Sequence, residues 1–409
     1  MEDQFHIKQL QYKKDAYIIV EGKQKADFFF VIQEGKVKII KVTMVRDKDD
    51  VLGPGDIFGI ISTMSSHSHI ETAQALTDVV LIPVHQHQYA EFIEKNTEVA
   101  IKIIMQFSKY LRYLNETLVK FTLKKTAVNS LSHLYNVGEY YFNQNQYNQA
   151  VYAYTQYLKH CPDGSKTAVA RDRLEKLAGK GYAVKTEFNT NDINRTYRKN
   201  AILFAEGEPG DELFIIQKGS VKITKIVDNK EMLLAMLNPG DLFGEMALLE
   251  GKLRTASAVA YEDCEVLAVN KANFELLIKS QPLLITKITS LLADRLWLMD
   301  EQLANALIDD PIGRMYDALF IQLEKSRVRL NGAVPYTFAF GRPELYKMVG
   351  IPEHEGDMLM SEMMKKNKKL MIMSGKIHTA SVEEIYKQSE YFRKMNREKA
   401  KKKIRSINH

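Results

Sequence analysis

Glu245 and Arg254 stand nine positions apart in a segment whose residue types could bind a phosphate. The segment reads FGEMALLEGKLRTA over residues 243–256, and Gly244 directly precedes the glutamate. Backbone N–H groups in a short helical turn after a glycine can hold phosphate oxygens. An arginine guanidinium can fork onto the same oxygens. Because a carboxylate repels phosphate, the natural partner of Glu245 is a hydroxyl group that lies beside it.

The elements that must position this segment occur twice in the sequence. Residues 17–40 and 201–223 share an apolar run, Glu-Gly, a polar loop, Gln-x-Gly and an alternating Val-Lys-Ile strand. Further on, LGPGDIFG in the first copy matches LNPGDLFG in the second. Short Val, Ile and Phe runs separated by Gly and Pro-Gly predict strands. The sequence therefore predicts two small antiparallel jelly rolls, each followed by helical sequence at about 88–125 and 271–307.

Residues 243–256 resemble the phosphate-binding cassette of cyclic nucleotide-binding domains, and the upstream glycines of both copies fit that family. The resemblance implies that Arg254 binds the cyclic phosphate and that Glu245 accepts from a ribose hydroxyl. It also implies that the regulatory ligand is a cyclic nucleotide, with cAMP as the first candidate, and that the chain has no cofactor. The alternative is a structural jelly roll with a surface arginine and glutamate. The ligand-binding residues implied are Gly244, Glu245, Met246, Ala247, Arg254 and Thr255.

The first copy departs from this pattern at both charged positions. Ile60 stands where the second copy has Glu245, and Glu71 stands where it has Arg254. A carboxylate beside a phosphate leaves the ligand without a counter-charge. We therefore expect the first barrel to bind no cyclic nucleotide in the usual way and to act as structural support or as a dimer contact.

Residues that could carry out catalysis or bind a metal are sparse. The two cysteines, Cys161 and Cys264, are far apart, so neither a disulfide framework nor a thiolate site is indicated. Two His-x-His pairs invite a metal hypothesis, but no cysteine or carboxylate cluster accompanies them, and solvated loop histidines are the simpler interpretation. We expect no catalytic residue, no metal and no enzyme activity. The paired histidines are His67, His69, His85 and His87.

The middle segment, residues 131–164, resembles one tetratricopeptide repeat. Gly138 and Ala150 would let its two helices approach closely while tyrosines fill the seam. One such repeat cannot bury its faces alone. It is either a helical spacer docked on its own chain or on a second copy, or a groove for a protein partner.

The helical segment after the second barrel carries a heptad seam. Apolar and small residues recur with steps of four and three, as in a helix that packs against another helix. The resemblance places a dimerising helix here, so we expect a homodimer. Packing inside one chain, or on its own barrel alone, would give the same pattern. The seam residues are Ile285, Thr289, Leu292, Leu296, Met299, Leu303 and Ala306.

Residues 309–382 resemble the winged helix-turn-helix of Crp/Fnr-type regulators, with a recognition helix that begins after Pro352. Its first turns carry Glu353, Glu355 and Asp357, which oppose entry into a phosphate-lined groove. DNA is therefore one candidate partner and a protein contact is the other. The residues expected to contact DNA phosphates are Arg342, Lys365, Lys366, Lys401 and Lys402.

The chain of 409 residues carries a net charge of +6, and its C-terminal end accounts for all of the excess. Residues 392–409 hold eight Lys or Arg and one Glu, so the rest of the chain is slightly acidic. This distribution favours non-specific phosphate contact by a tail. No apolar run is long enough for a membrane span and no signal sequence is visible, so we expect a cytoplasmic protein without a membrane partner.

These observations predict an α+β multidomain chain and one of two functions. The first is a homodimeric, cyclic nucleotide-responsive transcriptional regulator. The second is a nucleotide-sensing adaptor that acts through protein contacts. The expected parts are a degenerate nucleotide-binding domain, a tetratricopeptide-like segment, a nucleotide-binding domain with its dimerisation helix, a winged helix-turn-helix and a basic helical tail, at residues 1–125, 126–180, 181–307, 308–382 and 383–409.

Overall fold

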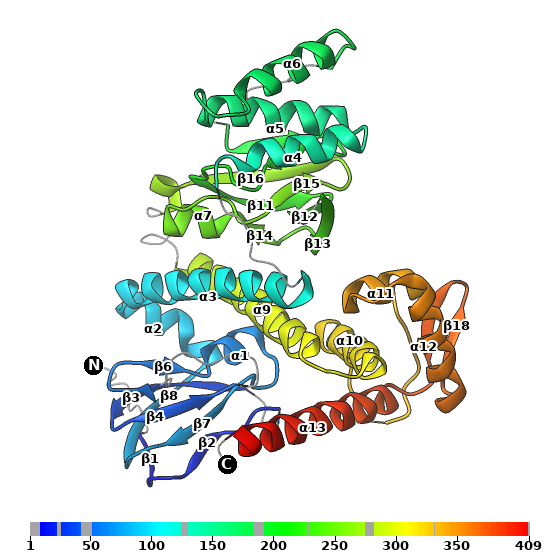
Figure 1. Cartoon of the computed structure of the whole chain (residues 1–409). Coiled ribbons are helices and arrows are strands. Elements are labelled where there is room, and N and C mark those ends of the chain that lie inside the picture. Colours follow the sequence, from blue (N-terminus) through cyan, green and yellow to red (C-terminus); the bar gives the residue numbers. More distant parts are fainter. Residues whose placement is uncertain are drawn as a thin grey trace. The chain divides into compact units, whose positions relative to one another are not determined.

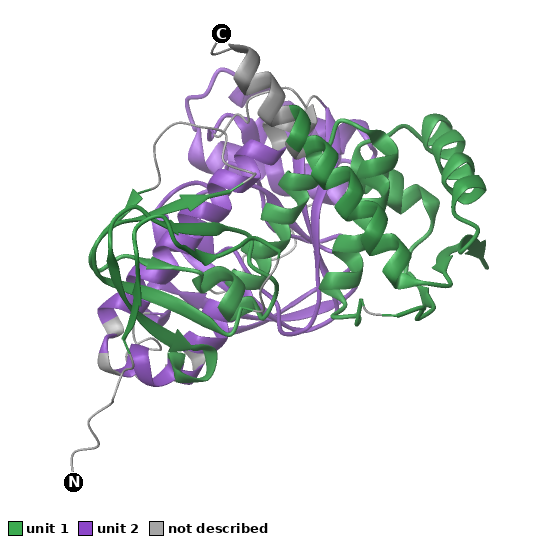
Figure 2. Cartoon of the chain, turned by 90° about the horizontal axis from the view of Figure 1, so that it is seen from below, with its two compact units in different colours: residues 1–89, 293–409 green, residues 90–292 purple. Residues whose placement is uncertain are grey.

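The computed structural model describes residues 9–22, 26–41, 51–123, 130–182, 192–227, 229–274, 282–330 and 332–407. Two compact units divide the chain (Figure 2). Unit 1 comprises residues 1–89 and 293–409, and unit 2 comprises residues 90–292. Among the described residues, no helix is both long enough and apolar enough to cross a membrane.

The first barrel, in unit 1, consists of short strands and one short helix (Figure 1). These are β1 Leu10–Tyr12, β2 Tyr17–Ile19, β3 Phe28–Glu34, β4 Val37–Ile40, β5 Val51–Leu52, β6 Ile57–Phe58, α1 Ile60–Ser65, β7 Thr72–Ala75 and β8 Val79–His85. The strands form two antiparallel sheets with the orders β1-β8-β3-β6 and β2-β7-β4-β5. Inward-facing Ile32, Val37 and Leu81 are fully buried between the sheets, as the alternating pattern predicts.

The second barrel, in unit 2, repeats this topology strand for strand. Its elements are β9 Asn194–Tyr197, β10 Ile202–Phe204, β11 Glu212–Lys218, β12 Val221–Val227, β13 Lys230–Leu237, β14 Leu242–Phe243, α7 Glu245–Glu250, β15 Ser257–Ala260 and β16 Cys264–Asn270. Its sheets have the orders β14-β11-β16-β9 and β10-β15-β12-β13. The internal repeat is therefore confirmed as two jelly rolls of one design.

The Gln-x-Gly motif of each copy has a common steric cause. Gly35 and Gly219 turn the chain between two strands with positive φ angles of 87° and 75°. A Cβ atom on either glycine would lie 2.3 Å from the backbone oxygen of Asp78 or Asp263, respectively. Only glycine fits such a left-handed, crowded turn, which explains why the motif occurs in both copies.

Unit 2 also holds a group of helices before the second barrel. They are α3 Thr97–Leu123, α4 His133–Asn143, α5 Tyr147–His160 and α6 Thr167–Ala178, and the shorter α2 Tyr89–Lys95 precedes them. A Cβ on Gly138 would lie 2.6 Å from the ring of Tyr154, so α4 and α5 are in close contact there. Their buried tyrosines share one apolar core with Ile202 and Val259 of the second barrel. The middle segment is thus docked on its own chain.

The C-terminal part of unit 1 contains two helices joined by a short turn and then a hairpin. Its elements are α10 Pro311–Lys325, β17 Tyr336–Thr337, α11 Arg342–Val349, α12 Glu353–Lys366, β18 Leu370–Met373, β19 Lys376–Thr379 and α13 Val382–Ile407. Gly350, with a φ angle of 67°, ends α11. Ser374 and Gly375, both with positive φ, form the hairpin turn. The helix α12 begins directly after Pro352, where the sequence predicts the start of a helix.

The helix α13 is an integral part of this C-terminal fold, which the sequence did not indicate. Val382, Ile385 and Ser389 are fully buried, and α13 packs along α10. The guanidinium of Arg393 binds Asp317 of α10 and also lies 2.5 Å from Glu301. Glu301 belongs to α9 Pro282–Ala306, whose seam residues Leu296 and Leu303 are buried within unit 1.

Candidate functional site

Residues 243–256 form one continuous cassette in the second barrel. Gly244, with a φ angle of 80°, precedes α7, and Gly251, also left-handed, ends it. Left-handed backbone favours glycine at both ends. The first-turn N–H groups of a helix have no partner within that helix. The two glycines therefore bound a single short helix whose first residue is Glu245.

Arg254 lies inside the barrel wall rather than on the surface. Its Nη1 donates to the backbone oxygen of Gly244 at 2.5 Å and its Nη2 to that of Glu212 at 2.7 Å. The guanidinium carbon lies 4.1 Å from the centre of the Phe204 ring. Arg254 is only 5% exposed, and its Nε–H has no hydrogen-bond partner. Buried donors that no protein group satisfies are rare, so the Nε–H of Arg254 is available to an acceptor from a ligand.

The charges around Arg254 are buried with it. Burial lowers the pKa of Arg254, and the negative charge of Glu208 opposes that shift. Burial also raises the pKa of Glu208, while hydrogen bonds from the Ala205 N–H and from the Tyr152 hydroxyl oppose that shift. Tyr152 comes from α5, so the docked helices contact a residue that faces the arginine.

The other predicted ligand-binding residues gather at the same place. Glu245 is 1% exposed and contributes negative charge next to Arg254. Met246 and Ala247 are also buried, and the Thr255 hydroxyl lies 3.9 Å from the sulfur of Met246. The structure thus brings all six predicted residues together in one cassette.

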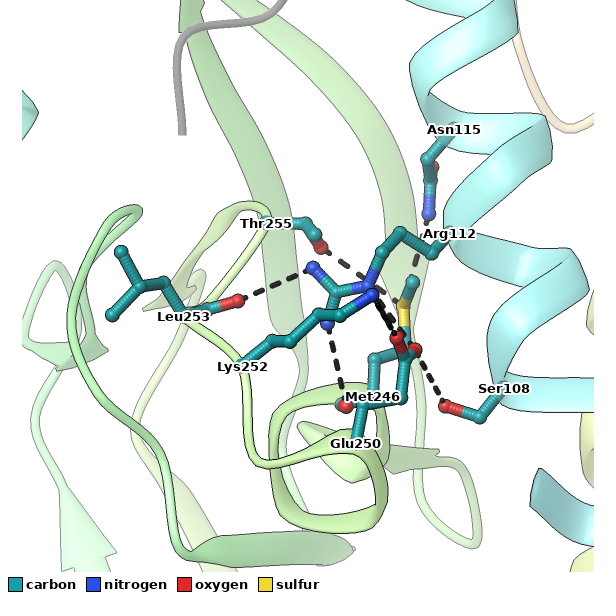
Figure 3. Close-up of polar contacts among 8 residues, drawn as sticks. All are labelled: Ser108, Arg112, Asn115, Met246, Glu250, Lys252, Leu253 and Thr255. Atoms are coloured by element: carbon teal, nitrogen blue, oxygen red, sulfur yellow. Dashed lines mark hydrogen bonds and ion pairs between the residues drawn. The ribbon is translucent and has the colours of Figure 1, made fainter. Parts of the chain in front are cut away.

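Two basic residues that the sequence did not single out also contact the cassette. Lys225 donates from its ammonium group to the backbone oxygen of Thr255 at 2.7 Å and pairs with Glu206 at 2.6 Å. Lys225 occupies an inward position of β12, where the alternating pattern otherwise places apolar residues. This break in the pattern is the sequence feature that could have identified it. Arg112 of α3 binds Glu250 at the end of α7 (Figure 3).

The corresponding cassette of the first barrel holds a carboxylate in place of the guanidinium. Glu71 accepts from the Gly59 N–H at 2.6 Å, and its other oxygen lies 3.3 Å from the ammonium of Lys41. Glu71 and Lys41 are both largely buried. An anion therefore already occupies this position, next to a cation, in a barrel that also lacks the glutamate of the second copy.

Comparison with known proteins identifies both barrels. The family described as cyclic nucleotide-binding domain matches residues 9–96 and 194–281. The cAMP-activated global transcriptional regulator CRP of Pasteurella multocida is 33% identical over 156 residues, which cover 38% of this chain and 74% of that protein. The chain belongs to the CRP family of transcriptional regulators.

Other relatives and solved structures of the CRP family also match. A CRP-like cAMP-activated global transcriptional regulator of Mycobacterium tuberculosis is 31% identical over 36% of this chain, which spans 66% of the length of that relative. A crystal structure of a CRP/FNR-family transcriptional regulator from Thermus thermophilus matches with a TM-score of 0.37 and 20% identity, over 48% of this chain and 98% of that one.

Two of the four paired histidines in this CRP-family chain are not the solvated residues that the sequence suggested. His69 is buried, and burial lowers its pKa. His67 stacks on Trp297 of α9 with ring centres 4.0 Å apart, and the Trp297 indole N–H donates to the backbone oxygen of Ser68. The loop of the first cassette thus packs on α9 within unit 1. Among the described residues, no group of three or more potential ligands could hold a metal ion.

The residues predicted to contact DNA differ in their surroundings. Arg342 pairs with Asp357 at 2.9 Å, and the Tyr346 hydroxyl donates to the same carboxylate. Lys365 is exposed, whereas Lys366 pairs with Glu362 at 2.6 Å. The side chains of Lys401 and Lys402 lie outside the described residues, although their backbone belongs to α13.

Proposed function

We propose that this CRP-family chain is a cyclic nucleotide-responsive transcriptional regulator that binds cAMP in its second barrel. The observation that carries the proposal is the buried Arg254, whose Nε–H lacks an acceptor inside a cassette of the matched family. An exocyclic phosphate oxygen would satisfy this donor with a charge-assisted hydrogen bond. Glu245 would accept from the ribose, and the backbone of Met246 and Ala247 would complete the phosphate cradle.

Binding in this way requires a local change at Arg254. Its Nη1 and Nη2 now donate to the backbone oxygens of Gly244 and Glu212. A phosphate would compete for these donors, because a charged acceptor forms the stronger bond. The cassette would then shift relative to the barrel. We expect α9 to pass this shift to α13, because Glu301 of α9 pairs with Arg393 of α13. The first barrel would take no nucleotide, because Glu71 supplies the anion there.

Isothermal calorimetry on the full chain tests the ligand site. The chain is titrated with cAMP, cGMP and a cyclic dinucleotide, first as wild type and then as Arg254→Lys and Arg254→Ala. We expect one cAMP per chain for wild type and loss of binding for Arg254→Ala. The control is Arg198→Ala, since Arg198 is an exposed arginine of the same barrel. Equal binding by Arg254→Ala and wild type would refute the assignment.

The proposed output is DNA binding by a cytoplasmic homodimer, with residues 308–382 as the winged helix-turn-helix. Lys365 and its neighbours would contact phosphates, and the pairing of Arg342 with Asp357 would offset one of the negative charges of α12. A nucleotide-sensing adaptor is the second candidate. It is favoured by Glu353 and Glu355 in the first turn of α12 and by the side chain of Met358, which is 66% exposed. Fluorescence anisotropy with specific and random DNA, with and without cAMP, distinguishes the transcriptional regulator from the adaptor.

A further inference from the structure

The helix α3 lies against the cassette of the second barrel although it follows the first barrel in sequence (Figure 3). Ser108, Arg112 and Asn115 share one face of α3, because they are spaced by four and three residues. The Arg112 Nε lies 3.0 and 3.1 Å from the two carboxylate oxygens of Glu250, and the Ser108 hydroxyl donates to the same carboxylate at 3.3 Å. The contact is therefore a polar one, directed at the end of α7.

Arg112 binds the cassette at three separate points. Besides Glu250, its Nη2 donates to the backbone oxygen of Met246 and its Nη1 to that of Leu253, each at 3.4 Å. Met246 lies in the first turn of α7, and Leu253 directly precedes Arg254. One planar guanidinium thus joins the beginning of the cassette helix, its end and the approach to the phosphate-binding arginine.

Because the ion pair of Arg112 and Glu250 is buried, separating the two side chains would cost free energy. The side chains of Arg112 and Glu250 are 7% and 4% exposed. Lys252 also lies 3.1 Å from Glu250, but its side chain is 60% exposed. A buried ion pair adds little net stability over apolar packing, whereas losing one partner is strongly unfavourable. Its effect is to fix one arrangement of the groups that it joins, here α3 and the cassette.

We propose that Arg112 is a positioning residue for the nucleotide site of the second barrel, so that the helix which follows the first barrel sets the nucleotide affinity of the second. The proposal rests on the proposed function of the second barrel. Arg112 contacts the cassette through Glu250, Met246 and Leu253. Through Arg112, the helix that follows the degenerate first barrel contributes to ligand binding in the second barrel. The first barrel itself binds no ligand.

Two measurements on the full-length chain test this role. The first is cAMP affinity by calorimetry for wild type, Arg112→Met and Arg112→Lys. The second is backbone amide hydrogen exchange over residues 245–256 in the absence of nucleotide. We expect Arg112→Met to weaken cAMP binding by about tenfold, the scale of residues that couple to a site without touching its ligand, and to accelerate exchange in the cassette. For Arg112→Lys, both the affinity and the exchange rate should lie between those of wild type and Arg112→Met, because an ammonium cannot reach all three acceptors.

The matched control is Lys109→Met, an exposed position of the same helix, which should change neither quantity. Wild-type affinity and wild-type exchange in Arg112→Met would overturn the proposal. If that variant does not fold, the same result in Arg112→Lys overturns it. If wild type binds no cyclic nucleotide, the proposed function fails, and the exchange comparison still decides whether Arg112 holds the cassette.

Discussion

Glu71 accepts a hydrogen bond from the backbone N–H of Gly59 at 2.6 Å. At the equivalent positions of the second barrel, Arg254 donates to the backbone oxygen of Gly244. The same turn of the same fold thus receives a negative side chain in one copy and a positive one in the other. We therefore expect a ligand phosphate to suit only the second arrangement, because in the first the carboxylate already takes the backbone donor and the nearby cation, Lys41.

Replacing Glu71 with alanine should destabilise the first barrel. The change removes the carboxylate beside the buried Lys41 and the acceptor of the Gly59 N–H. Breaking a buried ion pair by removing one partner costs about 3–5 kcal/mol. Thermal unfolding monitored by circular dichroism should show a lower midpoint. Glu34→Ala, at an exposed position of the same barrel, should leave it unchanged, and an equal midpoint in Glu71→Ala would contradict the account.

Gly210→Ala should reduce nucleotide affinity while the fold persists. A Cβ at this position would lie 2.3 Å from the Nε of Arg254. Because the guanidinium ends a flexible side chain, it can move away more readily than the backbone. We expect cAMP affinity to fall by about tenfold, as for other displaced charge-assisted contacts. Gly53→Ala, where a Cβ would meet nothing within 4 Å, is the control, and calorimetry together with a thermal melt measures both effects.

The stability of the α9–α10–α13 junction should depend on pH through Glu301. Burial raises the pKa of Glu301 to about 7, and the charge of Arg393 opposes that shift. Because the folded-state pKa lies above the ordinary value of 4.5, the folded protein binds this proton more tightly than the unfolded one. The stability from this group is therefore full below about pH 4.5 and is lost as the pH rises through about 7.

Glu301→Gln should remove this dependence. The amide is neutral at every pH, so the variant should gain stability over wild type at pH 8 relative to pH 5, by at most about 3 kcal/mol. Unfolding midpoints of both proteins across this pH range measure the difference. A constant difference between the two midpoints would show that Glu301 does not titrate there.

Tyr152→Phe should weaken the docking of α5 on the second barrel. The Tyr152 hydroxyl donates to the buried Glu208 at 3.0 Å, and phenylalanine leaves that carboxylate with one donor fewer. A buried group that loses its partner costs about 1–3 kcal/mol. Tyr147→Phe is the matched control, because its hydroxyl bonds the exposed Asn145. Chemical denaturation should separate the two variants, and equal stability would argue against the contact.

Ending the chain after Lys399 should keep the C-terminal fold and weaken non-specific DNA binding. Arg393 remains, so its pairs with Asp317 and Glu301 are retained, whereas ending the chain at Val382 would remove them. The deleted segment carries Lys401, Lys402, Lys403 and Arg405. If these contact phosphates, the salt dependence of binding should fall by up to about four counterions. An unchanged salt slope would exclude the tail as a phosphate contact.

The repeat and the cassette could be predicted from the sequence because local sterics determine them. Gly35 and Gly219 mark the same crowded turn, and Gly244 and Gly251 bound one short helix. The opposite charges of Glu71 and Arg254 could be compared directly once the two copies were aligned. Each of these inferences depends only on neighbouring residues and on the repeat.

The contacts that join different elements could not be predicted in this way. Arg112 binds Glu250 across 138 positions and Arg393 binds Asp317 across 76. In the sequence, both arginines look like ordinary charges on helical surfaces. The loop histidine His67 likewise stacks on Trp297, which lies far along the chain. Such pairs depend on tertiary packing, which spacing alone does not encode.

The bond between Arg112 and Glu250 is intramolecular, and this determines how it responds to dilution. Two groups on one chain meet at an effective concentration set by the connecting segment and not by the amount of protein. The contact therefore stays closed in a single molecule. The share of nucleotide affinity that depends on Arg112 should accordingly be the same at low and high protein concentration, in a lone chain and in a pair of chains alike.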